Sequence, residues 1–422
     1  MEFKLRSCVW EITLACCFSC KYCGSRAGKA RENELSTEEC LSVADQLAEL
    51  GCRRVSMIGG EVFMRRDWAE IVGRLTSQGV RVAIITNGFL FKPELIGKLR
   101  ELRIESVAVS LDGTEAVHDK YRQQGSFRRA LTAIDTLRAG GVPVSVITTI
   151  NSENVSLLED MFSILKDRGI AAWQLQACSP MGNAAEGGVD YRFDPNRVIA
   201  FVERHLRCPF PLGIADNIGY YTEGEGSLRG NTSGKAVFTG CRAGLTSIGI
   251  DSVGNVRGCE SMYDERFNEG NLREKSLREI WEDPDAFAYN RKFTPDLLTG
   301  ACASCPKGKY CAGGCRSYNY FVHGRLYEAP ACARVLKKKP PVPPKGCFRQ
   351  ASTPQRWASR WLTCWAATGS RGCWAAASCS TTPLWEASSE TRLSWRWSTT
   401  TRPSNSETGS GTSCQKPQNN KQ

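Results

Sequence analysis

The chain has 422 residues, of which 41% are hydrophobic and 23% are charged. This length is enough for two or three domains with hydrophobic cores of their own. No stretch approaches the roughly 18 consecutive apolar residues that a membrane-spanning helix needs, and the first residues lack the apolar run of a signal peptide. We therefore expect a cytoplasmic protein with no membrane partner.

The net charge of +11 is unevenly distributed along the chain. Residues 336–422 contain 13 Lys and Arg against 3 Glu, whereas the first 335 residues contain 42 basic and 41 acidic side chains. A nearly neutral body has no electrostatic reason to bind a polyanion. We therefore expect no nucleic-acid partner.

Residues 336–422 also differ from the rest in composition. They hold 7 of the 11 Trp, no Tyr and no Asp, and they show no helical or strand period. One interpretation is a flexible basic tail that opens with lysines and prolines. The other is translation out of frame, because disordered segments are poor in aromatic residues and cores are patterned. The composition favours the second interpretation, and we assign no function to this tail.

Sixteen cysteines lie in the first 335 residues, and their spacing is informative. In a cytoplasmic chain such a density favours metal binding over disulfides. The first group has the spacing Cys-x3-Cys-x2-Cys and consists of Cys16, Cys20 and Cys23. The second group consists of Cys241, Cys259, Cys302, Cys305, Cys311, Cys315 and Cys332. We interpret the other six cysteines as small buried hydrophobic residues.

Between the two groups, apolar strands alternate with amphipathic helices. We expect strands at 9–14, 54–58, 81–85, 106–111, 142–150 and 171–178, and helices at 36–50, 68–77, 92–102, 126–139 and 156–168. Short apolar strands are typical of a parallel sheet that is buried on both faces. Right-handed crossovers would curl six such units into an open (β/α)6 partial barrel of the α/β class, with its working face at the carboxyl ends of the strands.

Polar and glycine residues follow these strands and are expected to meet on one rim. The three-cysteine loop follows the first strand, and the next two strands are followed by Gly59-Gly60-Glu61 and by Asn87. Ser110 lies at the end of the fourth strand, and Asp112 follows it. Three thiolates can hold three irons of a 4Fe–4S cube and leave the fourth iron open to a small molecule. A zinc site or an incidental cluster is the alternative for the three cysteines alone. The glycines allow close backbone approach to a ligand and Glu61 offers an acceptor for an ammonium group, which favours iron–sulfur.

Taken together, these residues resemble the radical S-adenosylmethionine enzymes. The resemblance rests on Cys16, Cys20 and Cys23, on Tyr22 just before the third cysteine, and on the Gly-Gly-Glu motif. It implies that the open iron binds the amino and carboxylate groups of S-adenosylmethionine. It also implies that an electron from the cluster cleaves this cofactor to a 5′-deoxyadenosyl radical, which takes hydrogen from the substrate. A low-potential reductant such as flavodoxin or ferredoxin would supply the electron.

The same resemblance implies roles for cofactor-binding residues. The methionine amino group would be held by Gly59, Gly60 and Glu61, the adenine would lie near Tyr22, and the ribose and carboxylate side would be served by Ser110 and Arg122. Asn87 and Asp112 are further candidates, although Asn-Gly and Asp-Gly are also ordinary turn formers. For Arg122 the alternative is a solvated charge on a loop.

The second group of cysteines resembles the SPASM extension, which binds two auxiliary 4Fe–4S clusters in a subset of these enzymes. Taken alone, four of its thiolates could also bind zinc. By the resemblance, the outer cluster would be ligated by Cys302, Cys305, Cys311 and Cys332, and the inner cluster by Cys241, Cys259 and Cys315. The fourth inner ligand stays open between a distant residue such as Cys208 and an open iron. We therefore expect S-adenosylmethionine and three 4Fe–4S clusters as cofactors.

The resemblance also divides the chain into parts. We expect the partial barrel at residues 1–184, a bridging segment at 185–240, a Cys-rich auxiliary iron–sulfur domain at 241–335 and the basic tail at 336–422.

Glu260 directly follows Cys259, where similar enzymes that oxidise a side chain place a proposed base. A substrate radical must lose a proton as it gives up its electron, so Glu260 is our candidate catalytic residue. The alternative is a solvent-facing glutamate in an acidic segment.

Three functions follow from these patterns. The leading one is oxidation, cross-linking or thioether formation on a peptide or protein, since many SPASM enzymes act on peptides. The second is the same chemistry on a small molecule, such as dehydrogenation of a sugar or an aminocyclitol. The third is a non-enzymatic iron–sulfur electron carrier or a zinc-binding protein, which would not need the Gly-Gly-Glu rim.

Overall fold

The computed structural model describes residues 3–336, except 216, 223 and 230–237. These residues belong to one compact unit of the chain. The tail predicted for residues 336–422 lies, apart from Leu336, outside the described residues. None of the helices in the described ranges is both long and apolar enough to cross a lipid bilayer.

The frame of the fold is a ten-stranded sheet in the order β10-β9-β8-β1-β2-β3-β4-β5-β6-β7. From β1 to β6 each strand pairs in parallel with the next one along the chain, which confirms the predicted α/β class with a parallel sheet. The strands are β1 (Ser7–Glu11), β2 (Arg54–Ile58), β3 (Arg81–Thr86), β4 (Ser106–Ser110), β5 (Val144–Ile150), β6 (Ala172–Ala177), β7 (Leu212–Ile214), β8 (Ser247–Ile250), β9 (Asn255–Arg257) and β10 (Gly270–Asn271).

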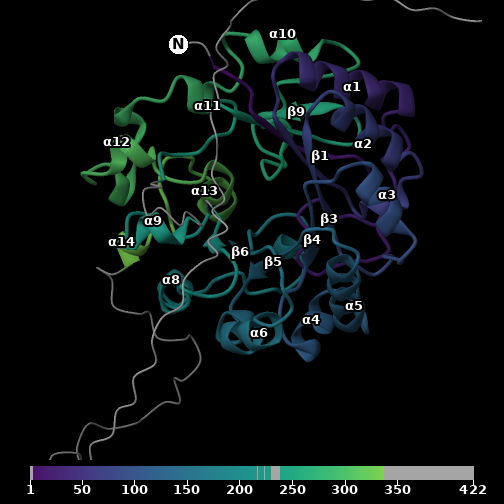
Figure 1. Cartoon of the computed structure of the whole chain (residues 1–422). Helices are drawn as coiled ribbons and strands as arrows, with labels where there is room; N and C mark the ends of the chain where they lie inside the picture. The colour runs from purple at the N-terminus through teal and green to yellow at the C-terminus, as the bar shows by residue number, and fades with distance from the viewer. Residues whose placement is uncertain (1–2, 216, 223, 230–237, 337–422) are drawn as a thin grey trace, which may run out of the picture. The chain divides into compact units, whose positions relative to one another are not determined.

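Helices connect the parallel strands and follow the outer side of the row of strands (Figure 1). They are α1 (Thr37–Glu49), α2 (Trp68–Ser77), α3 (Leu95–Glu101), α4 (Glu115–Tyr121), α5 (Ser126–Ala139) and α6 (Leu158–Leu165). The later helices are α7 (Asn183–Glu186), α8 (Pro195–Arg204), α9 (Glu225–Leu228), α10 (Leu277–Glu282), α11 (Ala288–Arg291), α12 (Gly308–Cys311), α13 (Arg316–His323) and α14 (Ala333–Leu336). Helix α1 begins with the predicted capping box, in which Ser36 and Glu39 satisfy each other's backbone N–H groups.

The first strand ends three residues before its predicted end. Ile12 N still donates to Ile58 O at 2.9 Å, but beyond it Leu14 N donates to Glu34 Oε1 at 2.6 Å and Thr13 O accepts from Gly60 N at 2.7 Å. The last two bonds replace strand pairing with the contacts that start the cysteine loop.

The sheet also extends beyond the six predicted strands. On one side β7 pairs in parallel with β6, and on the other β8 pairs in parallel with β1. The second pairing joins the Cys-rich C-terminal segment directly to the first strand of the barrel. Helix α4 was likewise not predicted. All three elements are too short to show a period in the sequence.

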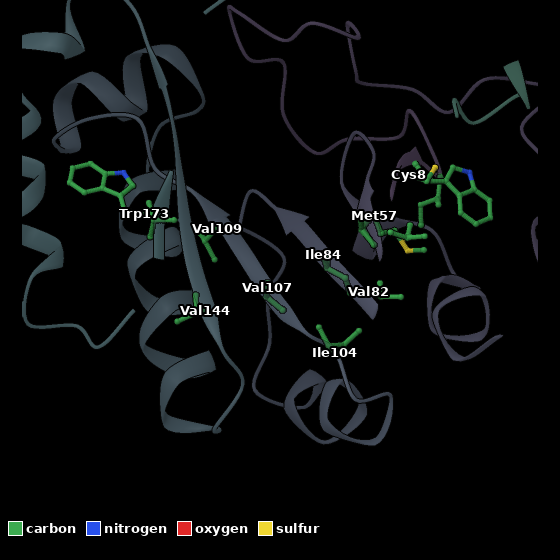
Figure 2. Close-up of a cluster of buried hydrophobic side chains, with 14 of the residues drawn as sticks. Cys8, Met57, Val82, Ile84, Ile104, Val107, Val109, Val144 and Trp173 are labelled. Carbon is green, nitrogen blue, oxygen red and sulfur yellow. The ribbon is translucent and has the colours of Figure 1, made fainter. Parts of the chain in front are cut away.

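Apolar side chains from adjacent strands fill the space beneath the helices. Figure 2 shows part of this core, with residues of six neighbouring strands or their immediate flanks: Cys8, Met57, Val82, Ile84, Ile104, Val107, Val109, Val144 and Trp173. Two of the largest fully buried side chains are the indoles of Trp10 and Trp173. Trp173 Nε1 donates to Thr148 Oγ1 at 2.8 Å, whereas Trp10 Nε1 has no hydrogen-bond partner among the described residues.

This difference predicts that Trp173→Phe destabilises the protein more than Trp10→Phe. Both changes remove the same atoms from a buried site, but only Trp173→Phe breaks a hydrogen bond, which contributes about 1 kcal/mol. The Trp10 change instead removes a buried donor without a partner. Thermal denaturation of the two variants under anaerobic conditions measures the difference, and an equal or reversed order of melting temperatures would contradict it.

Candidate functional site

The three-cysteine loop leaves β1 and is closed at its base by backbone pairing. Cys16 N donates to Gly28 O at 2.9 Å, and Gly28 N donates to Leu14 O at 3.0 Å. Inside the loop Cys23 N donates to Cys20 O at 3.2 Å, which forms a tight turn between the last two cysteines. The loop therefore returns to its starting point and keeps its three thiols within one short segment.

The thiols of this loop are electrostatic neighbours. Burial raises the pKa of Cys20 to about 12, the nearby Arg122 guanidinium opposes the shift, and the Cys23 and Cys16 thiols add to it. Cys17 hydrogen-bonds the Cys16 thiol. No disulfide joins any of the sixteen cysteines in the part of the chain that the structure describes.

Among the described residues, no three Cys, His, Asp or Glu side chains stand close enough together to hold a single metal ion. One zinc ion would need its sulfur ligands at about 2.3 Å from the metal. A 4Fe–4S cube is larger and takes each thiolate on a separate iron. The donor set of the loop, three neighbouring thiols and no carboxylate, fits such a cube.

The Gly59-Gly60 turn packs against the backbone at the base of the cysteine loop. Besides the Gly60–Thr13 bond, Glu61 N donates to Ala15 O at 2.8 Å. A Cβ atom on Gly60 would lie 2.3 Å from Ala15 O, and one on Gly59 would lie 2.7 Å from Thr13 O. Because these Cβ atoms would meet backbone oxygens, which cannot move aside as a flexible side chain can, only glycine fits at positions 59 and 60. The two glycines therefore have a packing role of their own, in addition to the cofactor contact expected from the resemblance.

Glu61 is fully buried, and its carboxylate accepts hydrogen bonds from the chain itself. Thr86 Oγ1 donates at 2.8 Å, Asn87 N at 2.9 Å and Phe63 N at 3.3 Å. Burial raises the pKa of Glu61, and these donors oppose the shift. The carboxylate thus ties the Gly-Gly-Glu turn to the end of β3. An ammonium group bound at Glu61 would share the carboxylate with these donors.

Asn87 extends this connection to the cysteines. Its Nδ2 lies 3.5 Å from Cys17 Sγ and 3.9 Å from Cys16 Sγ, and its Oδ1 accepts from Phe89 N at 2.8 Å. Asn87 therefore makes a local turn and also reaches the thiols, whereas its contact with S-adenosylmethionine stays a prediction. Donors to ligand sulfurs are one of the ways in which a protein tunes an iron–sulfur cluster.

Asp112 holds two other candidate cofactor-binding residues together through hydrogen bonds. It is fully buried, and it accepts from Tyr22 Oη, Arg122 Nε and, at 2.6 Å, Thr149 N. The side chain of Arg122 is 12% exposed, so this cation is paired and largely shielded from solvent. Three candidate residues from distant positions are thereby in direct contact, and Ser110 ends β4 two residues before Asp112.

The segment that follows β6 covers the cysteine loop. Asn183 Nδ2 donates to Cys20 O at 2.8 Å, and Asn183 N donates to Cys23 O at 2.9 Å. A Cβ atom on Gly182 would lie 2.2 Å from Cys23 O. The last strand of the six-strand barrel is therefore linked to the loop of the first.

The C-terminal cysteines gather in two places. Cys302, Cys311 and Cys332 lie in one apolar cluster with Tyr220 and Phe238. Burial raises the pKa of Cys311 to about 11, and its charged neighbours include the thiols of Cys302, Cys332 and Cys305. The structure thus brings together the four residues that the resemblance assigns to the outer cluster.

The second place holds Cys241 and Cys259, which pack against Met262 and Phe267. Burial raises the pKa of Cys259 to about 12, with a further contribution from the Cys241 thiol. Cys315 precedes α13, and its thiol and that of Cys241 are both electrostatic neighbours of Arg316. Cys208 lies elsewhere, after α8, where its thiol donates to Phe210 O at 2.8 Å.

Glu260 is buried, and neither of its carboxylate oxygens has a hydrogen-bond partner among the described residues. Burial raises its pKa well above the ordinary range, and its charged neighbours include Glu11 and Arg257. It is therefore not the solvent-facing glutamate of the alternative interpretation. No hydrogen bond joins it, within the described ranges, to the Asp112 group.

Sequence inspection missed the polar cluster around Glu260. Arg31 Nη1 donates to Glu11 Oε1 at 2.6 Å, and its guanidinium also contacts the hydroxyls of Ser252 and Tyr263. These bonds connect the end of the cysteine loop to the C-terminal segment. The available signal was Glu11 itself, a charged residue inside an otherwise apolar strand.

The packing of the Gly-Gly turn predicts the effect of Gly60→Ala. The new methyl group must push apart two backbone segments, which should cost about 1–3 kcal/mol and disturb the base of the cysteine loop. Gly28→Ala is the matched control, because a Cβ atom there meets nothing within 4 Å. Iron content after anaerobic reconstitution and the melting temperature are the measurements. Equal values for the two variants would rule out the packing role.

Comparison with known proteins gives matches to both cysteine-bearing regions. Residues 10–165 match the Radical SAM superfamily, and residues 241–306 match SPASM, an iron–sulfur cluster-binding domain. The AdoMet-dependent heme synthase of Methanosarcina barkeri is 32% identical over 347 residues, which are 79% of this chain and 98% of that protein. Mycofactocin maturase MftC of Mycobacterium ulcerans is 31% identical over 340 residues, or 77% of this chain and 89% of the maturase.

Solved structures agree with this fold. Streptococcus suis SuiB bound to S-adenosylmethionine aligns with a TM-score of 0.63 at 16% identity and covers 78% of this chain and 77% of SuiB. Native anSMEcpe with bound AdoMet aligns with a TM-score of 0.60 at 17% identity, over 78% of this chain and 95% of the other. The predicted resemblance, the barrel fold and the enzyme class are confirmed. The chain therefore belongs to the radical S-adenosylmethionine enzymes that carry a SPASM iron–sulfur domain.

Proposed function

We propose that this enzyme uses three 4Fe–4S clusters to oxidise a peptide or protein substrate, with the three-cysteine loop as the radical-forming site. The observation that supports the radical-forming site is the packing of the Gly-Gly turn onto the base of the loop. Cys16 lies beside Asn87 and Glu61, and the Cys20 thiol has those of Cys16 and Cys23 as neighbours. Similarity to mycofactocin maturase supports a peptide substrate. So does the fold shared with SuiB, which was also solved with the precursor peptide SuiA.

When bound, the loop cluster and S-adenosylmethionine supply a 5′-deoxyadenosyl radical that removes one hydrogen atom from the substrate. The residues around the loop hold the cofactor in position. Tyr22 and Arg122 are fixed by Asp112, so that the aromatic ring and the guanidinium are preorganised for an adenosine and a carboxylate. Asn183 covers the loop from the β6 side, which limits access of water to the radical.

A second hydrogen must leave the substrate as a proton if the reaction is an oxidation, and the departing electron needs an acceptor. We assign the proton to Glu260, because its buried carboxylate has two oxygens without a partner among the described residues. It directly follows Cys259, one of the proposed ligands of the inner auxiliary cluster. The electron would go to that cluster and leave through a low-potential carrier protein.

The similarity to the heme synthase favours a second candidate, in which the substrate is a tetrapyrrole side chain. The two candidates are separated by incubating reconstituted enzyme, reductant and S-adenosylmethionine with two probes. One is a set of synthetic peptides from short reading frames beside the gene, and the other is iron-coproporphyrin III. We expect loss of two hydrogens from a peptide, measured by mass spectrometry, together with increased 5′-deoxyadenosine. Conversion of the porphyrin alone would overturn the peptide assignment.

The same assay tests the cysteine loop. The triple change Cys16→Ala, Cys20→Ala and Cys23→Ala should remove one cluster and abolish 5′-deoxyadenosine formation. Cys17→Ala is the matched control and should keep both, because Cys17 lies outside the Cys-x3-Cys-x2-Cys spacing. Reductive cleavage of the cofactor by the triple variant would show that the site has been placed wrongly.

Glu260→Gln should uncouple cofactor cleavage from product formation. The amide keeps the shape of the side chain but cannot take a proton, so product formation should fall by roughly 100-fold while 5′-deoxyadenosine still forms. Glu265→Gln changes an exposed carboxylate in the same segment and should leave both rates unchanged. If the Glu260→Gln variant forms product at the wild-type rate, Glu260 is not the base.

A further inference from the structure

Arg316 is a fully buried cation in the Cys-rich segment. It opens α13 directly after Cys315, and its side chain has no exposed surface. Its Nη1 donates to Leu326 O at 3.1 Å and to Ala312 O, and its Nε donates to Tyr289 O at 3.4 Å. These carbonyl acceptors fix the guanidinium in place, but they bring no negative charge.

No Asp or Glu within the described residues forms an ion pair with Arg316, in contrast to other buried guanidinium groups. Arg122 is paired with Asp112, and Arg257 is paired with Asp251 at 2.9 Å. A buried charge without a counterion is strongly unfavourable, so an ion such as Arg316 needs an anionic neighbour.

Besides Tyr327, the titratable neighbours of Arg316 are thiols from both C-terminal groups. They include Cys241 and Cys315 of the proposed inner set and Cys311 of the proposed outer set. The rest of the environment is aromatic, since the guanidinium lies 4.5 Å from the ring centroid of Tyr327 and 5.4 Å from that of Phe293. The negative charge that balances this cation can therefore come from thiolates once they bind iron.

We propose that Arg316 is the shared countercharge of the two auxiliary clusters. This inference rests on the proposed function, because it requires that both sets of cysteines hold clusters. One-electron reduction adds one negative charge to a cluster, and a fixed cation nearby favours the reduced form and raises the reduction potential. We assign Arg316 no contact with the substrate. It is a positioning residue that sets the reduction potentials of the auxiliary clusters, through which the substrate electron leaves.

The test compares Arg316→Gln and Arg316→Lys in full-length enzyme that also carries the triple cysteine change in the N-terminal loop. Only auxiliary clusters then contribute to the paramagnetic signal, and a redox titration followed by electron paramagnetic resonance gives their potentials. Arg316→Gln should shift the reduction equilibrium at least tenfold toward the oxidised form, which corresponds to about 59 mV for one electron. Arg316→Lys keeps the charge and should stay near the unchanged enzyme.

Arg291→Gln is the matched control. Arg291 also donates to backbone carbonyls, those of Gly244 and Trp281, but its charged neighbours are Glu269, Tyr289 and Asp283, with no cysteine among them. Its loss should leave the potentials unchanged. An equal shift in this control would show that general loosening of the segment is the cause and would overturn the proposal.

The remaining outcomes are also decisive. If Arg316→Gln loads iron fully and shifts nothing, the proposal is wrong. If it fails to load iron while Arg316→Lys loads and keeps the potentials, the need for the charge is supported. If the lysine variant fails in the same way, the carbonyl contacts and not the charge are what matter. A parent protein that contains zinc or no iron in the C-terminal segment would instead overturn the proposed function.

Discussion

The site depends on one backbone contact, the packing of the Gly59-Gly60 turn against residues 13–15. This contact sets where the cysteine loop leaves β1, and it also carries Glu61 to the end of β3. Asn87 follows in the same sequence of contacts and reaches the thiols. A short motif after the second strand thus positions groups from three strands.

The C-terminal segment is organised differently. It is joined to the barrel through pairing of β8 with β1 and through the Arg31 contacts. Its interior, however, contains buried thiols, the cation of Arg316 and the carboxylate of Glu260, which has no hydrogen-bond partner in the part of the chain that the structure describes. Such a composition is a poor hydrophobic core by itself. Bound iron–sulfur clusters would explain these buried charged groups as part of the folded state, since metal binding and folding are commonly coupled.

Much of the fold could be predicted because the chain has clear local patterns. β2, α2 and α5 have the predicted bounds, since their apolar periods start and stop at turn residues. The cysteine spacing likewise identified an N-terminal and a C-terminal set, and the family resemblance divided the C-terminal set in two. Long-range contacts could not be predicted in this way. Burial of Arg316 depends on Tyr289 and Leu326, and the anchor role of Asp112 depends on Tyr22, while the Asp-Gly pair on its own indicates only a turn.

The central claim is that the N-terminal loop holds a 4Fe–4S cluster with one iron free for S-adenosylmethionine. Mössbauer spectroscopy of enzyme reconstituted with ⁵⁷Fe, recorded with and without the cofactor, tests it most directly. We predict that addition of S-adenosylmethionine changes the signal of a single iron in one cluster and leaves the signals of the other irons unchanged. A spectrum that does not respond to the cofactor, or a purified protein that carries zinc in place of iron, would contradict it.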